Sequence, residues 1–188
     1  MTHKGTVTIK TERLILRKFM LDDVQKVFNN WTSDPEVSKY TRQQSHDCVE
    51  ETERYIKDLI GAYQNIENYY WAIALADSNT PIGRINITGI NEPIESVCVS
   101  FMIAREYWNK GYITEALSSI VQFFFEEVGA NRIEGRNDIQ NPASGKVMIK
   151  CGFQYEGLLR QGGRNRFGLV DCKQYAIIAD DYYALRTK

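Results

Sequence analysis

Apolar and polar positions along the chain follow two different periods. Apolar residues spaced three and four positions apart predict helices, whereas alternating or continuous apolar runs predict strands. The clearest helix begins after Gly111, where one stripe contains Leu117, Ile120, Val121, Phe124 and Val128. The segment before it, Val97 to Ile103, is apolar and rich in β-branched and aromatic residues, so it predicts a strand buried on both faces. The unit is strand, short loop, helix.

The same patterns predict the other elements of the chain. Helices are expected within residues 22–31, 45–63 and 141–153. Ser45 is the expected N-cap of the second of these helices, Asn141 is that of the third, and Gly152 lies just past the end of the third. The remaining strands are expected at residues 13–19, 71–76, 81–90, 131–136, 158–163 and 171–179.

The order of these elements predicts an α/β fold in one domain that spans residues 1–188. The strand at 97–103 connects through a helix to the strand at 131–136, so these two should be parallel neighbours. The other strands follow one another closely and should pair antiparallel. We therefore expect a mixed, mostly antiparallel sheet of about seven strands with helices on both faces and a parallel pair at its centre.

Composition and charge narrow the classes of function. The formal net charge is −1, which gives no general reason to expect nucleic acid or an anionic membrane as partner. The four cysteines form no CxxC pair, and with only two histidines no metal site is expected. The chain contains neither a signal peptide nor an apolar window long enough to span a membrane. A cytoplasmic protein is expected.

Two stretches have residues suited to ligand binding. A helix N-terminus presents unpaired N–H groups and a partial positive charge, and Gly111 would let an anion such as phosphate approach the backbone. The alternative is that Gly111 only permits a tight turn. Neither GxGxxG nor GxxxxGK[ST] is present. Asn141 and Pro142 open the later helix, where a purely structural capping role is the simpler interpretation.

Taken together, "YWNKGYITEAL", "RIEGRNDIQNPASGKVMIKCGF" and "LLRQGGRNRFGLVDCKQY" resemble the GNAT superfamily of acetyl-CoA-dependent N-acetyltransferases. The early "TERLILRKF" and "SDPEVSKY" resemble its ribosomal-protein N-acetyltransferase (RimJ/RimL-like) branch. The resemblance runs from about residue 11 to residue 183. It implies that the Gly111 loop holds the pyrophosphate of coenzyme A.

The resemblance also implies roles for individual residues. The pyrophosphate would be surrounded by Trp108, Asn109, Lys110, Gly111, Tyr112, Ile113 and Thr114. The pantetheine arm would bond to the main chain of Phe101, Met102 and Ile103. Asn141 would also contact the cofactor, and Ser144 would protonate the leaving thiolate. Two interpretations are open for Lys146 and Lys150: they contact a phosphate of the cofactor, or they lie on a solvated helix face.

The chain departs from the family pattern at the catalytic base. A carboxylate common in this branch falls at Cys98, and the general-acid Tyr of many other members falls near Met148. Glu134 and Glu95 are the nearest carboxylates and the candidates for a base or an amine-orienting group. A nucleophilic role for Cys98 is disfavoured because no His partners it and buried thiols are usually inert.

Direct transfer of acetyl to a primary amine is therefore the expected activity, with a protein or peptide N-terminal α-amine as acceptor. The alternatives are a polyamine or aminoglycoside acceptor, or a module that binds acyl-CoA without turnover. The acceptor pocket should lie on residues 31–45 and 161–168, since such pockets form on variable loops. If the acceptor is a protein N-terminus, the partner would be a ribosomal or other protein. The chain could also form a homodimer, which the sequence does not decide.

Overall fold

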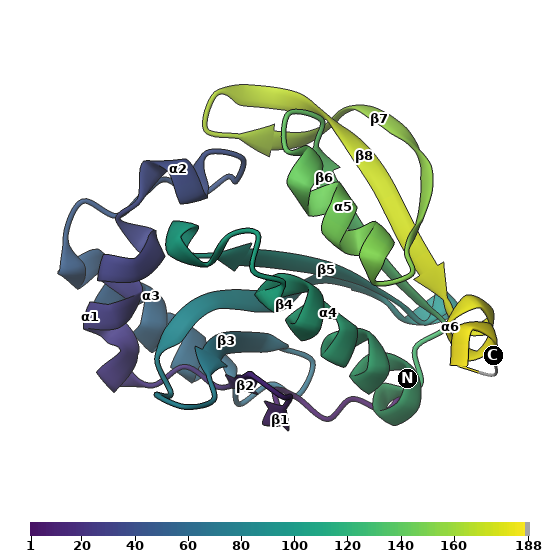
Figure 1. Cartoon of the computed structure of the whole chain (residues 1–188), viewed down its shortest axis with the longest axis horizontal. Helices are drawn as coiled ribbons and strands as arrows, with labels where there is room; N and C mark the ends of the chain where they lie inside the picture. The colour runs from purple at the N-terminus through teal and green to yellow at the C-terminus, as the bar shows by residue number, and fades with distance from the viewer. Residues whose placement is uncertain (187–188) are drawn as a thin grey trace.

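The computed structural model describes residues 1–186, and its centre is a single sheet of eight strands (Figure 1). The strands are β1 (Ile9–Lys10), β2 (Leu14–Arg17), β3 (Tyr70–Leu75), β4 (Pro81–Asn91), β5 (Ser96–Ile103), β6 (Arg132–Asp138), β7 (Gln154–Asn165) and β8 (Gly168–Ile178). Their order across the sheet is β1-β2-β3-β4-β5-β6-β8-β7. Only β5 and β6 pair in parallel; every other neighbouring pair is antiparallel. The predicted mixed sheet with a central parallel pair is confirmed.

Helices cover both faces of this sheet. They are α1 (Val24–Val27), α2 (Pro35–Ser38), α3 (Val49–Ala62), α4 (Tyr112–Phe123), α5 (Pro142–Lys150) and α6 (Ala179–Arg186). Short 3-10 or π turns lie at η1 (Leu21–Asp23), η2 (Phe28–Thr32), η3 (Glu92–Ile94), η4 (Arg105–Tyr107) and η5 (Phe124–Val128). The larger apolar cluster joins α4 and α5 to one face, and a second cluster joins α1, α2 and α3 to the other.

Helix α4 forms as its apolar stripe predicts. All five stripe residues are buried in the larger cluster, where they pack on the strand residues Val97, Val99 and Ile133. Gly111 lies at the N-cap with a φ of +82°, and Gly129 closes the far end of the helix, beyond η5, with a φ of +76°. Both positions need the left-handed backbone that glycine adopts without strain.

Several sequence-based expectations differ from the structure. Helix α3 begins at Val49 with Cys48 as N-cap, so the expected cap at Ser45 is wrong; residues 45–48 instead form the end of an irregular loop. Strand β5 is buried at Ser96, Val97 and Val99, whereas Cys98 and the last four residues are half-buried. The apolar residues of this last part pack at the edges of the two apolar clusters and are not fully enclosed. Strand β1 and helix α6 were not expected.

A buried ion pair anchors β2 to the first helical turn. The guanidinium of Arg17 donates from Nη1 and Nη2 to the two carboxylate oxygens of Asp23, at 2.7 and 2.8 Å. Both residues are under 9% exposed. Removing one partner of such a pair leaves a buried charge without compensation.

We therefore expect Arg17→Met to lower the free energy of unfolding by about 3–5 kcal/mol, measured by urea denaturation. Lys57→Met is the control, because Lys57 forms an exposed pair with Glu53 one helical turn away. Such pairs contribute about 0.3–0.5 kcal/mol. Equal, small effects of the two substitutions would contradict the structural importance of the buried pair.

Candidate active site

The two parallel strands separate halfway along their length. Their pairing runs from Ser96 opposite Arg132 to Val99 opposite Gly135, and then stops. Strand β5 nevertheless stays paired to β4 as far as Ile103, and β6 stays paired to β8 as far as Asp138. Each strand therefore keeps its outer neighbour while the two inner edges diverge, which leaves an opening at the centre of the sheet.

The inner edge of β5 presents main-chain groups to this opening. In an antiparallel pair, alternate residues direct their N–H and C=O groups to the partner strand. Ala104 N–H donates to Ile82 O of β4 at 2.8 Å, so Met102 and Ser100 also face β4. Phe101 and Ile103 consequently face the opening. The carbonyl of Ile103 accepts a hydrogen bond from Trp108 Nε1 at 2.9 Å, and the main chain of Phe101 is available to an extended ligand.

The loop after β5 ends in a cradle of backbone N–H groups. Asn109 has a φ of +60° and Gly111 a φ of +82°, so the chain turns sharply before α4. Within residues 1–186, the N–H groups of residues 109–114 donate no hydrogen bond to another residue. They lie at the positive end of a twelve-residue helix. This arrangement suits an anion such as a pyrophosphate.

Arg13 supports this loop from the start of β2, which the sequence pattern did not indicate. Its Nη1 donates to Lys110 O at 3.1 Å, and its Nε donates to Glu115 in the first turn of α4 at 2.7 Å. The guanidinium also lies 4.5 Å from the ring centroid of Tyr112. No sequence signal links residue 13 to a loop almost a hundred residues later; only the fold does.

Helix α5 begins beside the free end of β6. Asn141 is its N-cap, but the Asn141 side chain makes no capping hydrogen bond. Ser144, in the first turn, is half-exposed, and its hydroxyl has no partner among the residues described. At the end of β6, Asn137 is buried, and its Oδ1 is a buried acceptor without a hydrogen-bond partner in the described chain. This atom lies beneath α5, since a Cβ added to Gly145 would be 3.1 Å from it.

The two candidate carboxylates lie in different places. Glu134 is on β6 opposite Cys98, one residue before the strands separate, and it accepts a hydrogen bond from Gln174 Nε2 at 2.6 Å. Glu95 precedes β5 at its other end, where its carboxylate is 3.7 Å from the N-terminal amine. The structure thus brings Glu134, but not Glu95, to the opening.

Cys98 and Met148 lie at the positions where the family resemblance predicts a carboxylate and a tyrosine. Burial raises the pKa of the Cys98 thiol, and the nearby Glu134 carboxylate raises it further. A thiolate is therefore disfavoured at Cys98. Met148 is buried, and its Sδ packs so closely against Gly135 that a side chain there would collide with it. Neither position supplies a strong base.

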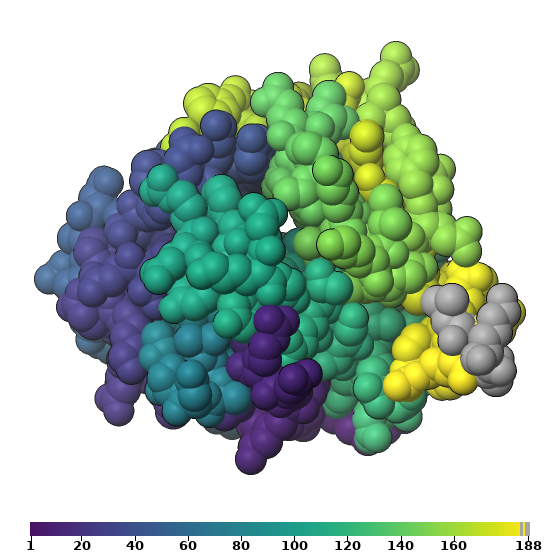
Figure 2. Space-filling model, viewed as in Figure 1, coloured from purple at the N-terminus to yellow at the C-terminus, as the bar shows by residue number. Residues whose placement is uncertain are grey.

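The two loops expected to form the acceptor pocket meet above the opening. In Figure 1, the tip of the β7–β8 hairpin reaches toward α2, and Arg166 Nη1 lies 3.5 Å from the carbonyl of Pro35. Figure 2 shows a hollow between the teal surface that leads into α4 and the green surface of α5, where the two strands diverge. An extended ligand could enter there and meet an acceptor beneath the two loops.

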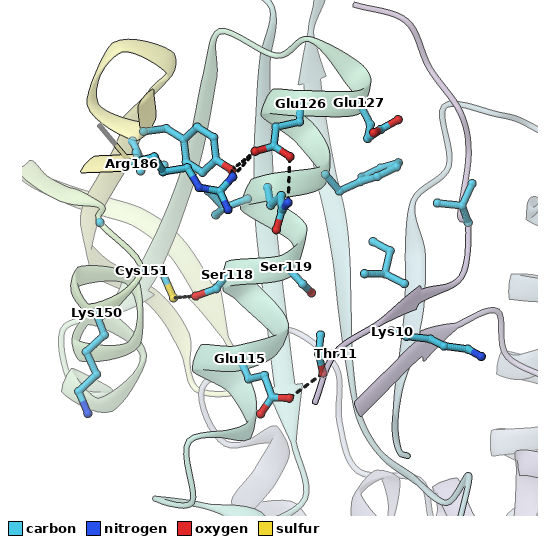
Figure 3. Close-up of a pocket in the computed structure, with 18 of the residues that line it drawn as sticks. Lys10, Thr11, Glu115, Ser118, Ser119, Glu126, Glu127, Lys150, Cys151 and Arg186 are labelled. Atoms are coloured by element: carbon cyan, nitrogen blue, oxygen red, sulfur yellow. Dashed lines mark hydrogen bonds and ion pairs between the residues drawn. The ribbon is translucent and has the colours of Figure 1, made fainter. Parts of the chain in front are cut away.

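A larger groove lies along the outer side of α4 and is a separate feature (Figure 3). It has a volume of about 1100 Å³ and runs from Glu115 to Glu126, bordered by β1, the end of α5 and α6. Its polar groups largely satisfy one another: Thr11 donates to Glu115, and Tyr182 and Arg186 donate to Glu126. Lys150 lines this groove, and Lys146 is exposed.

The described residues contain neither a cluster of metal-ligand side chains nor a membrane-spanning helix. Within residues 1–186, no three His, Cys, Asp or Glu side chains gather as metal ligands would. No helix in that range combines the length and apolar character needed to cross a bilayer.

Two splayed parallel strands, followed by an anion cradle at a helix N-terminus, define a site for an extended phosphorylated ligand such as coenzyme A. Comparison with known proteins agrees: a family described as the acetyltransferase (GNAT) domain matches residues 13–154. The chain belongs to this family and is an acetyl-CoA-dependent acetyltransferase.

Individual relatives cover nearly the whole chain. The uncharacterized N-acetyltransferase YoaA of Bacillus subtilis is 28% identical over 170 residues, which is 90% of this chain and 96% of YoaA. A GNAT-family acetyltransferase from Bacillus anthracis is 26% identical with a TM-score of 0.80, covering 93% of this chain and 99% of that one. A ribosomal-protein-S5-alanine acetyltransferase from Vibrio fischeri has a TM-score of 0.80 at 19% identity, covering 94% and 98%, and shows a shared fold.

Proposed function

We propose that this protein transfers the acetyl group of acetyl-CoA to the α-amine of a peptide or protein N-terminus. The observation that carries the proposal is the opening between β5 and β6, which leads directly to the cradle of free N–H groups at residues 109–114. An extended thioester ligand would place its pyrophosphate at the cradle and its acetyl group where the strands diverge. The acceptor would approach from beneath the loops that meet at Pro35 and Arg166.

Several features of the chain fit the cofactor. The pyrophosphate would be held by the N–H groups of residues 109–114, with Lys110 adding charge. The pantetheine amides would pair with the inner edge of β5 at Phe101 and Ile103. Acetyl-CoA supplies the thioester carbon that the amine attacks.

The transfer needs two protons to be moved. The amine nitrogen bonds to the thioester carbon, the carbon–sulfur bond then breaks, and the sulfur leaves as a thiolate. N–H groups on the inner edge of β5 would stabilise the intermediate oxyanion. We assign protonation of the thiolate to Ser144. Glu134, whose carboxylate already accepts hydrogen bonds from Gln174 and Arg132, would receive the amine proton directly or through water.

A site without a free, dedicated base favours an acceptor that needs little deprotonation. An α-amine has a pKa of about 7.7–8.0, so forming the neutral amine at pH 7 costs about 1 kcal/mol. An alkyl amine with a pKa of about 10.4 costs over about 4 kcal/mol. Cys98 in place of a carboxylate and the engaged Glu134 therefore suit an α-amine better. The ribosomal-protein acetyltransferase from Vibrio fischeri indicates that this fold accommodates protein acceptors.

We expect purified protein to release free thiol from acetyl-CoA only when an amine acceptor is present. The values of kcat/KM should be highest for short peptides with free N-termini, and lower for the same peptides N-blocked but containing Lys, for spermidine and for an aminoglycoside. Thiol release without formation of the acetylated amine would indicate hydrolysis of acetyl-CoA rather than acetyl transfer. A preference for any of the last three acceptors would refute the α-amine assignment while leaving the acetyltransferase activity in place.

A further inference from the structure

Within residues 1–186, two arginines are buried, and only one of them has a carboxylate as ion-pair partner. Arg17 is 8% exposed and pairs with both carboxylate oxygens of Asp23. Arg84 of β4 is 7% exposed, yet no Asp or Glu of residues 1–186 forms an ion pair with it. A buried guanidinium without an anion is costly, and proteins seldom keep one unless something pairs with it.

The neighbours of Arg84 are neutral polar groups. Its Nη1 donates a short hydrogen bond to Asn86 Oδ1, and its Nη2 lies 3.4 Å from Gln43 Oε1. The ring centroid of Tyr70 is 5.5 Å from the guanidinium carbon, and the Tyr70 hydroxyl is 2.5 Å from that of Tyr55. Burial raises the pKa of Tyr55 well above its usual value, so it stays a neutral phenol. None of these groups balances the positive charge.

The position of Arg84 connects it to the acceptor side of the opening. On β4, Asn86 lies opposite Ser100 of β5, and Arg84 lies opposite Met102. Ile85 belongs to the cluster under α4, so Arg84 and Asn86 point to the other face of the sheet. Gln43 comes from the loop between α2 and α3, within the segment expected to bind the acceptor. The buried charge thus lies one strand away from the free edge of β5.

We propose that Arg84 binds a carboxylate that the acceptor carries close to its amine. This inference rests on the proposed acetyl transfer to an α-amine and adds a second requirement for the acceptor, a carboxylate near that amine. One guanidinium balances the single charge of one carboxylate, and its planar fork matches the geometry of that group. The carboxylate can be the acceptor's own α-carboxylate, as in a free amino acid, or an acidic side chain at the start of a peptide. A polyamine would bring more positive charge to a buried cation, so it is disfavoured.

The test compares four acceptor arms that differ in the presence and source of the carboxylate. They are a free amino acid, the same amino acid as its amide, an amidated peptide with Asp at position 2, and the matching peptide with Asn. Wild-type protein should prefer the carboxylate-bearing member of one pair by about 10- to 100-fold in kcat/KM, which corresponds to one charge-assisted hydrogen-bonded contact. The pair that shows this preference identifies the source.

Arg84→Gln and Arg84→Met should abolish that preference, mainly through KM of the acceptor, while KM of acetyl-CoA stays within about twofold. Because the substitutions remove an uncompensated buried charge, the melting temperature should not fall. Arg54→Gln is the matched control, since it removes an exposed positive charge from α3, outside the two segments expected to bind the acceptor. It should leave the preference intact.

Three results would overturn the inference: no preference in the wild type, an equal loss for all four acceptors, or an equal effect of Arg54→Gln. If no acceptor is acetylated at all, the proposed function itself fails, and calorimetry with the Asp peptide and with the free amino acid, each in the presence of coenzyme A, then decides separately about Arg84. Binding that is weakened at least tenfold by Arg84→Gln supports the carboxylate site. Equal binding by wild type and variant refutes it.

Discussion

Replacing Gly111 by valine is expected to raise KM for acetyl-CoA by about 10- to 100-fold, because one or two charge-assisted contacts to the pyrophosphate would be lost. Gly111 has a φ of +82°, which a β-branched residue adopts only under strain. A Cβ at this position would also lie 3.4 Å from Arg13 Nη2, the side chain that supports the loop. The N–H groups of residues 109–114 would therefore shift out of alignment with the pyrophosphate. The rise in KM is measured from initial rates at varied acetyl-CoA concentration.

Gly129→Val provides a matched control for this experiment. Gly129 has a similar φ of +76° and closes the far end of the same helical segment, and a Cβ added there would meet no described atom within 4 Å beyond its chain neighbours. Both substitutions should lower the melting temperature, but only Gly111→Val should change KM. If the two variants have the same KM for acetyl-CoA, the loop does not hold the cofactor.

Replacing Ser144 by alanine is expected to lower kcat by about 10²- to 10⁴-fold, the range for loss of a general acid. KM for acetyl-CoA should change little, because the hydroxyl acts on the leaving sulfur and not on the phosphates. Its hydroxyl has no partner within residues 1–186 and lies in the first turn of α5, beside the end of β6. Met148 has no acidic proton, so it cannot replace Ser144 as a proton donor.

The control for this variant is Ser119→Ala. Ser119 is also half-exposed on a helix, but its hydroxyl donates to Ala116 O at 2.8 Å and lies on α4 beside the outer groove. It should retain wild-type kcat. A Ser144→Ala variant as active as Ser119→Ala would show that water or another group protonates the thiolate.

Much of the fold is determined by local sequence. The 3.6-residue stripe from Leu117 to Val128 predicts α4, and Gly111 predicts its start, because both signals act within a few residues. The strand–helix–strand order predicts the parallel pair of β5 and β6, because a helix that crosses over between two strands of one sheet leaves those strands parallel. The Gly111 loop, together with Asn141 and Ser144, also predicts a cofactor site, and those residue roles stay predictions.

Other properties arise only when distant segments meet. The half-burial of Phe101 and Ile103 was missed, because an apolar strand that lines an opening has the same composition as one in a core. Arg13 beside the Gly111 loop is equally invisible in sequence, since its contacts cross almost a hundred residues.

Sequence also could not separate Arg17 from Arg84. Both are arginines within predicted strands, yet only Arg17 receives a carboxylate when the chain folds. The sequence by itself thus determined α4 and the parallel pairing of β5 with β6, whereas the place of β8 between β6 and β7 came from the tertiary structure. Only the tertiary structure decided which charges are compensated, because burial and pairing depend on residues that the fold brings together from separate segments.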